Sequence, residues 1–582
     1  MIPFVSDRFS AYVQVGPSRW LSFRDPSLVL QADSPAAVRR TLADVEQLTR
    51  DRGLHAVGFV AFEAASAFGL ATRALPEPVL PLAWFALYEA SHVVESGPPA
   101  RTGDYLLGPL TPSIDRPAFD AAFGRIKEQL AAGNAYQVNF TFTMEGRFDG
   151  DAFSIFADLC AAQRGHHGAF IDLGDAAICS ASPELFFEFQ GTTIVARPMK
   201  GTASRGRTLD EDTAAGAALA ASQKERAENV MIVDMIRNDL GRVAEVGSVS
   251  VPELFVVERY PNVWQMTSEV RARSVAPLEE VFAALHPSAS VTGAPKARTM
   301  ELLAELEVAP RGVYTGAIGH VPPDGLAHFS VAIRTAVIDR PRSRLSFGIG
   351  SGIVWDSKPD AEYAECLLKG AILARRPAPF DLLETLRWTP DEGYYLLDRH
   401  LARLRRSAEY FGVPILLSEI QNALSMATGA AQDATRVRLL VAPDGRPRTE
   451  VRPHEPTPGV LRVTFSAEPI DSSDVFLFHK TTRREVYDRA RAGWGAVDEV
   501  ILWNERGEVT EATTANLVAD VGGDLITPPV GCGLLAGTMR AELLEGGEIR
   551  EGILMRHHLA AARRLWLINS VHGMRAVELI TP

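Results

Sequence analysis

The stretch ARPMKGTASRG, Ala196 to Gly206, places one lysine, Lys200, between an apolar run and a turn-forming Gly-Thr pair. The preceding residues, TTIVARPM, have the composition of a β-strand. A lysine that opens onto solvent there would be ordinary, whereas a lysine aimed into a pocket would be a nucleophile. The environment of Lys200 therefore has to be inferred from the rest of the chain.

Length and composition limit the classes of protein to which this chain can belong. The 582 residues exceed one ordinary core, and 46% apolar with 23% charged residues is typical of a soluble globular protein. No window approaches the roughly 20 apolar residues of a spanning helix, and MIPFVSDRFS lacks a secretory pattern. The net charge of −13 disfavours nucleic acid as a partner. We therefore expect a cytoplasmic protein with reduced thiols at its four distant cysteines, Cys160, Cys179, Cys366 and Cys532.

One boundary divides the chain. In ARRPAPFD, Ala374 to Asp381, two prolines end a long helical pattern. We therefore expect one domain over residues 1–376 and another over residues 377–582. The first mixes extended runs with helices so that distant strands must pair, which predicts an α+β fold. The first hundred residues show no recognisable chemistry and are expected to complete its sheet.

Three features of the first domain leave alternatives open. The glycines of SFGIGSGIV, including Gly350, form either a bend in a strand or a site where backbone N–H groups meet a small carboxylate. Two helical acid pairs, Glu225 with Glu228 and Glu362 with Glu365, are either solvated faces or oxygen ligands for Mg²⁺. Arg334, inside an apolar strand pattern, points either to solvent or to a buried anion.

Seven motifs then occur in a characteristic order, from SPELF (182–186) and RPMKGT to HPSASVTGAPK, YTGAIG, IRT and GSGIVWDSKPDAEYAE, with SQKERAENVMIVDMIRNDLG between. Together they resemble the chorismate-utilising family, which includes anthranilate, aminodeoxychorismate and isochorismate synthases. The resemblance spans about residues 115–375 and implies a large α/β sandwich around a site for Mg²⁺ and chorismate.

The resemblance also implies roles for individual residues. Glu228 and Glu362 would hold Mg²⁺, with Glu225 and Glu365 beside them. Glu184 would protonate the leaving hydroxyl, because hydroxide is a poor leaving group without a proton donor. The remaining residues of the substrate pocket would be Gln137, His286, Thr292, Tyr314, Arg334 and Gly350.

Two positions separate the members of this family. Water-adding members have a lysine base where this chain has Gln137, so isochorismate formation is disfavoured. Anthranilate synthases read P-I-A-G-T and aminodeoxychorismate synthases P-I-K-G-T, whereas this chain reads Pro-Met-Lys-Gly-Thr at 198–202. Lys200 is therefore expected to attack the ring, and ammonia to replace it. The chain shows no glutaminase motif, which implies ammonia from a separate glutamine amidotransferase subunit.

The second domain also has one informative stretch, FLFHKTTRREVYDRARA. In it, Lys480 follows an apolar run that predicts a strand. Glu511 lies in a strand–turn–strand pattern, and LLAGTMRAELL places Gly537 and Thr538 at the start of a helix, where phosphate can bind. A lysine, an acid and a phosphate anchor are what pyridoxal phosphate (PLP) requires of a protein.

These segments, with DRHLARLRRSAEYFG, resemble the fold-type IV PLP enzymes, which include branched-chain and D-amino-acid aminotransferases and aminodeoxychorismate lyase. The resemblance implies a two-lobed, class IV aminotransferase-like α+β domain that can form a homodimer. Lys480 would carry PLP, Glu511 would pair with its ring nitrogen, and Arg403 would contact its phosphate with Gly537 and Thr538. Tyr487 is a weaker candidate for the pocket.

The two resemblances together favour a bifunctional enzyme that makes 4-aminobenzoate, a folate precursor, from chorismate. One alternative joins aminodeoxychorismate synthase to a true amino-acid aminotransferase. Another is an anthranilate synthase-like activity, and a third is a regulatory protein with decayed sites. The motifs of the second domain do not by themselves separate lyase from transaminase.

Overall fold

The computed structural model describes residues 10–580 except 17, 74–79, 375–378, 456–458 and 496. Contacts divide the chain into two compact units: unit 1 holds residues 1–204 and 216–377, and unit 2 holds residues 205–215 and 378–582. Residues 375–378 of the expected boundary and the first nine residues lie outside the described ranges. The sequence did not predict that residues 205–215 belong to unit 2.

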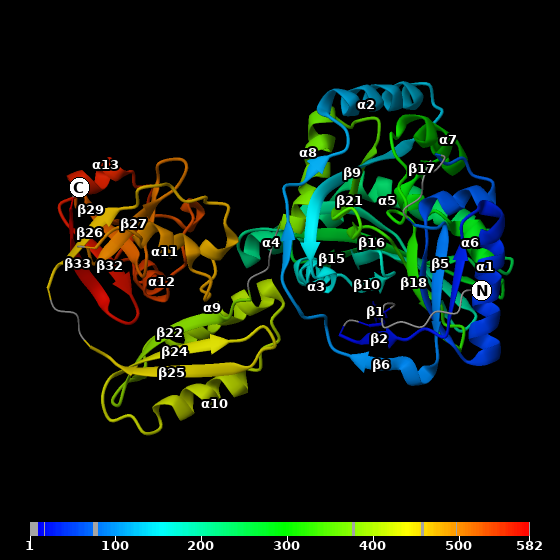
Figure 1. Ribbon diagram of the computed structural model, residues 1–582. Helices are drawn as coiled ribbons and strands as arrows, with labels where there is room; N and C mark the ends of the chain where they lie inside the picture. The colour runs from blue at the N-terminus through cyan, green and yellow to red at the C-terminus, as the bar shows by residue number, and fades with distance from the viewer. Residues whose placement is uncertain are drawn as a thin grey trace. The chain divides into compact units, whose positions relative to one another are not determined.

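Within its described residues, unit 1 has two sheets whose paired strands all run antiparallel, in agreement with the α+β expectation (Figure 1). The first sheet comprises β1 (Ser10–Gln14), β2 (Trp20–Arg24), β6 (Val93–Ser96), β7 (Tyr105–Leu107), β8 (Thr111–Pro112), β9 (Gln137–Gly150), β10 (His167–Asp172), β11 (Ala176–Ser182), β17 (Gly293–Ala294), β20 (Thr335–Asp339) and β21 (Arg344–Ile353). The second comprises β3 (Leu28–Ala32), β4 (His55–Val60), β5 (Ala83–Tyr88), β12 (Leu185–Gln190), β13 (Thr193–Arg197), β14 (Met199–Ser204), β15 (Ser250–Arg259), β16 (Val263–Arg273), β18 (Ala317–Val321) and β19 (His328–Val331). Strands from the first hundred residues complete both sheets, as expected.

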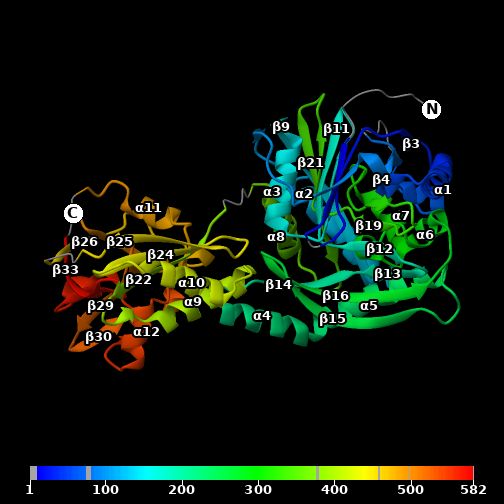
Figure 2. The same ribbon diagram turned by 90° about the horizontal axis from the view of Figure 1, so that it is seen from below.

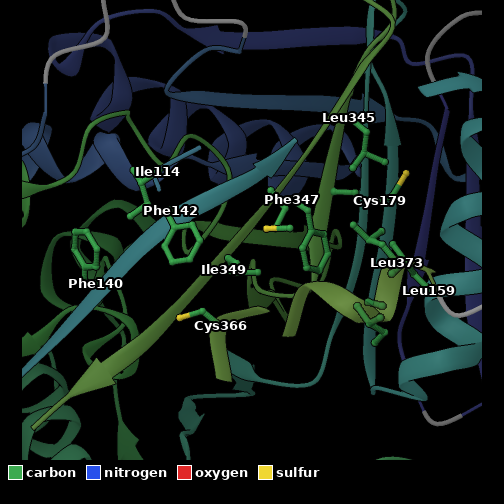
Figure 3. Close-up of a cluster of buried hydrophobic side chains, with 14 of the residues drawn as sticks. Ile114, Phe140, Phe142, Leu159, Cys179, Leu345, Phe347, Ile349, Cys366 and Leu373 are labelled. Atoms are coloured by element: carbon green, nitrogen blue, oxygen red, sulfur yellow. The ribbon is translucent and has the colours of Figure 1, made fainter. Parts of the chain in front are cut away.

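The helices of unit 1 cover the outer faces of the two sheets. They are α1 (Pro35–Arg52), α2 (Arg116–Ala131), α3 (Ala152–Gln163), α5 (Gln223–Gly241), α6 (Leu278–Leu285), α7 (Lys296–Leu306) and α8 (Pro359–Gly370), with short 3₁₀ turns η1 (Phe62–Phe68), η2 (Ala90–His92), η3 (Ala289–Val291) and η4 (Ala371–Ala374). Helices α2, α3 and α8 share a core with β9, β11 and β21 (Figure 3). Helices α1, α5 and α6 share another with the second sheet (Figure 2).

A third cluster joins the two sheets of unit 1. Phe23 of the first sheet packs with Phe59, Trp84 and Ile318 of the second. Each sheet is therefore apolar on both faces, one toward helices and one toward the other sheet. This layering is the α/β sandwich that the family resemblance implied.

Local sequence rules set the boundaries of the site helices. Helix α4 (Leu209–Ala221) ends and α5 begins on either side of Ser222. Ser222 is the N-cap of α5, and its hydroxyl accepts a hydrogen bond from the Glu225 N–H. Pro359 stands at the first turn of α8, where the missing N–H costs nothing.

Unit 2 has two lobes, each with its own sheet. One sheet is formed by β22 (Leu382–Thr389), β23 (Gly393–Tyr394), β24 (Thr435–Val441) and β25 (Pro447–Pro453), against which α9 (Leu397–Phe411) and α10 (Leu417–Thr428) pack (Figure 1). The other is formed by β26 (Leu461–Phe465), β27 (Glu499–Trp503), β28 (Val509–Ala512), β29 (Asn516–Val521), β30 (Asp524–Thr527), β31 (Arg550–Glu551), β32 (Leu565–Asn569) and β33 (Gly573–Leu579). Its helical segments are η5 (Val475–Leu477), α11 (Glu485–Arg491), η6 (Val530–Cys532), α12 (Thr538–Glu545) and α13 (Arg556–Ala561).

None of the helices in the described ranges is both long enough and apolar enough to cross a membrane. The four cysteines are free thiols.

Candidate active sites

The floor of the site in unit 1 is the glycine-rich part of β21. This segment is not a bend: β21 pairs with β9 in unbroken antiparallel register from Arg344 to Ile353. Its glycines instead allow close approach. A Cβ at Gly348 would lie 2.1 Å from the ring of Tyr314, and one at Gly352 would lie 2.8 Å from the Lys200 amine. Because alternate residues of a strand share a face, the floor is bare between these two side chains.

Gln137 and Lys200 meet above Gly352. The Gln137 side-chain nitrogen would lie 3.2 Å from a Cβ built on Gly352, beside the Lys200 amine. Gln137 is fully buried, yet neither its Oε1 nor its Nε2 has a hydrogen-bond partner in the structure. A buried, unsatisfied amide costs stability, and a ligand that pairs with the Gln137 side chain would recover that cost.

Both the main chain and the side chain of Lys200 have partners on α5. It lies on β14, and its carbonyl accepts a hydrogen bond from the Asn229 side chain of α5 at 3.1 Å. Its Nζ lies 3.7 Å from the Glu228 carboxylate, and both side chains are 19% exposed. Lys200 therefore faces a partly enclosed acidic site and is not a freely solvated lysine.

Glu184 is the most deeply buried acid of this group. It is 3% exposed, and its Oε1 accepts a hydrogen bond from the Ser290 hydroxyl at 2.6 Å. Burial raises the pKa of Glu184 to about 7, although the Ser290 hydrogen bond and the Lys200 charge oppose the shift. At neutral pH the side chain is thus divided between proton donor and carboxylate.

The two predicted acid pairs differ in their surroundings. Burial and the nearby Glu228 raise the pKa of Glu225. The pKa of Glu365 is lowered because, against burial, the charges of Lys369, Lys200 and Arg334 favour its carboxylate. Glu362 accepts a hydrogen bond from Ser357 at 2.6 Å. Among the described residues, no group of three or more His, Cys, Asp or Glu side chains is arranged to hold a metal.

Arg334 does not lie inside a strand, contrary to the sequence expectation. It falls between β19 and β20 at φ 53°, a left-handed conformation that turns the chain. Its Nη1 donates to the Lys369 carbonyl at 2.9 Å, and the Lys369 Nζ donates to the Gly350 carbonyl at 2.8 Å. Arg334 is thereby joined through α8 to the glycine floor, and burial raises the pKa of its neighbour Tyr314.

Thr292 and His286 shape the turn that supports Glu184. The Thr292 hydroxyl donates to the Ser288 carbonyl at 3.2 Å, and the Ser288 and Ser290 hydroxyls are 2.9 Å apart. The Nε2 of His286 donates to the Ala61 carbonyl at 3.0 Å, and burial lowers the pKa of His286 to about 3. The importance of Ser290 was missed from the sequence, although it lies within the HPSASVT motif.

Lys480 in unit 2 is held by the first lobe's sheet. The expected strand before it is instead the 3₁₀ turn η5, and Lys480 lies in an irregular segment. Its carbonyl accepts a hydrogen bond from the Leu383 N–H at 2.9 Å. Burial, followed by the charge of Arg403, lowers the pKa of Lys480 to about 8. A buried amine with such a pKa is suited to forming a Schiff base.

Glu511 of β28 lies within electrostatic reach of Lys480. Its carboxylate accepts hydrogen bonds from the Tyr487 hydroxyl at 2.8 Å, the Leu535 N–H at 3.2 Å and the Asn516 side chain at 3.1 Å. Burial nevertheless raises the pKa of Glu511 to about 7. A cationic partner such as a protonated ring nitrogen would restore its charge.

Arg403 of α9 already has hydrogen-bond partners within the protein, which the sequence did not indicate. Its Nε and Nη2 donate to the two oxygens of Glu384 at 2.9 and 2.6 Å, and its Nη1 donates to the Ala536 carbonyl at 3.2 Å. Despite burial, the Arg403 charge lowers the pKa of Glu384 to about 2. Arg403 thus holds the loop before Gly537, the N-cap of α12, while the Thr538 hydroxyl lies 3.3 Å from His400.

Two family descriptions match these two units. The chorismate binding enzymes match residues 8–375, and the class IV amino-transferases match residues 381–580. The first match covers well over half of the chain, so the chain belongs to the chorismate binding enzymes, followed by a class IV aminotransferase domain.

Individual relatives agree with this assignment. The chain is 40% identical to aminodeoxychorismate synthase component 1 of Salmonella typhimurium over 46% of its own length and 59% of the relative's. It is 35% identical to anthranilate synthase component 1 of Cereibacter sphaeroides over 46% and 54% of the two chains. The chain thus spans little more than half the length of these relatives. In fold it is similar to anthranilate synthase component I of Streptococcus pneumoniae, with a TM-score of 0.50 at 24% identity over 64% and 94% of the two chains.

Proposed function

We propose that unit 1 converts chorismate and ammonia into 4-amino-4-deoxychorismate, and that unit 2 splits this product into 4-aminobenzoate and pyruvate. The observation that carries the proposal is the Lys200 amine, placed over Gly352 beside the unpartnered amide of Gln137. An anthranilate synthase-like reaction needs open space at that position, which the lysine side chain occupies. The 40% identity to a protein named aminodeoxychorismate synthase component 1 supports the same choice.

In the first reaction, the Lys200 amine forms a bond to C2 of the chorismate ring as the C4–oxygen bond breaks. Glu184 supplies a proton to the departing hydroxyl, which leaves as water. Ammonia then forms a bond at C4, and the electron pair of the C2–nitrogen bond leaves with Lys200. The new amino group therefore stands para to the ring carboxylate's carbon. The buried Glu184, whose pKa is raised to about 7 by burial, can hold the required proton at neutral pH.

Binding a dianionic substrate in this site requires compensation for its carboxylates. Lys200 is the cation nearest to Glu228 in the site, at 3.7 Å, and its charge also acts on Glu184, Glu225 and Glu365. Glu228 and Glu362, on two helices, would hold Mg²⁺, which takes few protein oxygens and completes its shell with water and substrate. Bound there, Mg²⁺ would offset the repulsion between substrate and protein carboxylates.

In unit 2, PLP would supply an electron sink, with Lys480 as its attachment point and Glu511 as the partner of its ring nitrogen. The Lys480 amine would remove the proton from the carbon that bears the new amino group. The enolpyruvyl group would then leave, take up a proton to become pyruvate, and the ring would become aromatic. Burial lowers the pKa of Lys480 to about 8, which leaves more of its amine unprotonated near neutral pH, the form that can accept this proton.

Ammonia would come from a separate glutamine amidotransferase. The one cysteine in a glycine-rich setting, Cys532 of VGCGLLAG, lies in η6 of unit 2 and shows no glutaminase pattern. Free ammonium salt should replace that partner in vitro.

The test is product chromatography after incubation with chorismate, an ammonium salt and PLP. The wild type should yield 4-aminobenzoate and pyruvate. Lys200→Ala should form no aminodeoxychorismate, whereas Lys480→Ala should stop at that intermediate. Lys224→Ala is the control, since Lys224 of α5 also pairs with Glu228, at 3.9 Å, but its side chain is 67% exposed.

Three results would contradict the proposal. Formation of anthranilate would refute the role of Lys200. Undiminished activity of Lys200→Ala would do the same. Exchange between an amino acid and 2-oxoglutarate that outpaces pyruvate release would identify unit 2 as an aminotransferase.

A further inference from the structure

The segment Arg205–Ala215 lies in the first part of the sequence but belongs to unit 2. We call it the inserted segment. It begins directly after β14, the strand that carries Lys200 and ends at Ser204. Neither proposed reaction uses any of its side chains, yet the Arg205 and Asp212 side chains are buried.

A buried ion pair closes the inserted segment on itself. The Arg205 Nε lies 2.5 Å from the Asp212 carboxylate, and these side chains are 7% and 1% exposed. The same carboxylate oxygen accepts the Gly206 N–H at 3.1 Å. We call the turn that the Arg205–Asp212 pair closes the hook. A Cβ at Gly206 would lie 2.2 Å from the Asp212 backbone nitrogen, so only glycine fits at this position of the hook. Ion pairs this deeply buried hold one defined geometry, because separating them leaves an uncompensated charge.

The hook is fastened to helix α9 of unit 2. The Arg205 Nη2 donates to the Tyr410 carbonyl at 3.0 Å, and its guanidinium lies 4.4 Å from the centre of the Tyr410 ring. In return, the Tyr410 hydroxyl donates to the Gly206 carbonyl at 2.8 Å. Main-chain and side-chain bonds in both directions set the register of the segment on α9.

The inserted segment also binds His479, the residue before Lys480. The Nε2 of His479 lies 3.1 Å from the Arg207 carbonyl, and its Nδ1 lies 3.0 Å from the Ser407 hydroxyl. A carbonyl can only accept, so Nε2 carries the proton and Nδ1 accepts from Ser407. The Tyr410 ring lies 4.4 Å away, between centroids. His479 therefore has one tautomer and one orientation, both fixed by the segment and α9.

We propose that the inserted segment is a positioning element for Lys480, acting through His479. Lys480 stands between His479, held by Arg207 and Ser407, and Thr481, which pairs with Leu382. The amine of a long, flexible side chain can be aimed only if its main chain is fixed on both sides. The PLP domain thus depends on residues encoded within the chorismate-binding sequence. This inference rests on the proposed PLP chemistry of unit 2.

The test uses the full-length protein and measures PLP attachment, not turnover. Gly206→Ala should force the hook open. We expect PLP to bind about tenfold more weakly, the visible circular dichroism of bound PLP to change, and less Lys480 to be labelled after borohydride reduction. Formation of aminodeoxychorismate should persist. Tyr410→Phe, which removes only the hydroxyl bond to Gly206, should change the same signals less.

Arg406→Ala is the matched control. Arg406 pairs with Asp210 of the inserted segment, but these side chains are 49% and 79% exposed, so the pair contributes little. If Gly206→Ala and Tyr410→Phe bind PLP with the wild-type affinity and dichroism, the inserted segment does not position Lys480. A wild type that fails to attach PLP at Lys480 would instead overturn the proposed function of unit 2, and this inference with it.

Discussion

Replacing Glu184 by glutamine should slow the amination of chorismate by a factor of about 10² to 10⁴, the usual contribution of a positioned general acid. The substitution is nearly isosteric, and the glutamine Oε1 can still accept the Ser290 hydrogen bond that Glu184 accepts at 2.6 Å. The change therefore removes the proton while leaving the packing in place.

The pH profile separates this role from a structural one. Because burial raises the pKa of Glu184 to about 7, the wild-type rate should fall as the pH rises through about 7 and the acid is lost. The Glu184→Gln rate should lack that descending limb. Initial rates of chorismate loss need to be measured at a constant concentration of free ammonia, since the fraction of unprotonated ammonia also rises with pH.

The stability of the wild type should also fall as the pH rises. The raised pKa of Glu184 means that the unfolded chain releases this proton first, from about 4.5 upward, so the folded state loses stability between that pH and about 7. At about 1.4 kcal/mol per pH unit, the cost reaches about 3 kcal/mol above pH 7. Glutamine carries no such cost, so the variant's Tm should rise relative to the wild type between about pH 5 and about pH 8.

Two results would refute this reasoning. One is a Glu184→Gln rate within about threefold of the wild type, which is too small a loss for a general acid. The other is a difference in Tm that does not change with pH, which would place the pKa of Glu184 near its ordinary value.

Gln137→Leu should raise the Tm, because it removes a buried amide whose lack of a partner costs about 1–3 kcal/mol of stability. It should also raise the KM for chorismate. An unchanged KM would show that the amide does not contact substrate. His320 has its pKa lowered to about 3 by burial, and its Nε2 lies 3.1 Å from the Nδ1 of His55. Its contribution to stability is complete above about pH 6.5 and is lost as the pH falls, by about 3 kcal/mol near pH 4.5; His320→Asn should flatten the acid limb of Tm against pH, and an identical limb would exclude this histidine as its cause. Glu511→Gln should leave PLP attached to Lys480 after borohydride reduction but slow pyruvate release by at least about 100-fold, because a neutral amide cannot stabilise a protonated ring nitrogen; wild-type pyruvate release would remove that role.

Much of the fold could be predicted from local pattern. The extended run of β21 and the helical pattern of α8 are properties of short segments, and the structure has a strand and a helix at these places. The interruptions were harder to predict. Ser222 between α4 and α5 and the left-handed Arg334 between β19 and β20 depend on caps and turns that periodicity does not register.

The candidate sites were predicted only as lists of residues. The close packing of Tyr314 on Gly348 and of Lys200 on Gly352 joins segments that are separate in the chain, so no local motif encodes these distances. The engagement of Arg403 by Glu384 likewise depends on two elements meeting in unit 2. Ser290 and Asn229 were overlooked because serine and asparagine are common and their roles come entirely from their neighbours.

The sequence by itself determined the kinds of elements, the α+β class and the chemical groups available, since these follow from side-chain type and short-range periodicity. Only the tertiary structure decided which groups are buried together. Burial sets whether Glu184 carries a proton and whether the Gln137 amide lacks a partner. It also placed Arg205–Ala215 in unit 2 against His479, because long-range contacts depend on packing that no single segment specifies.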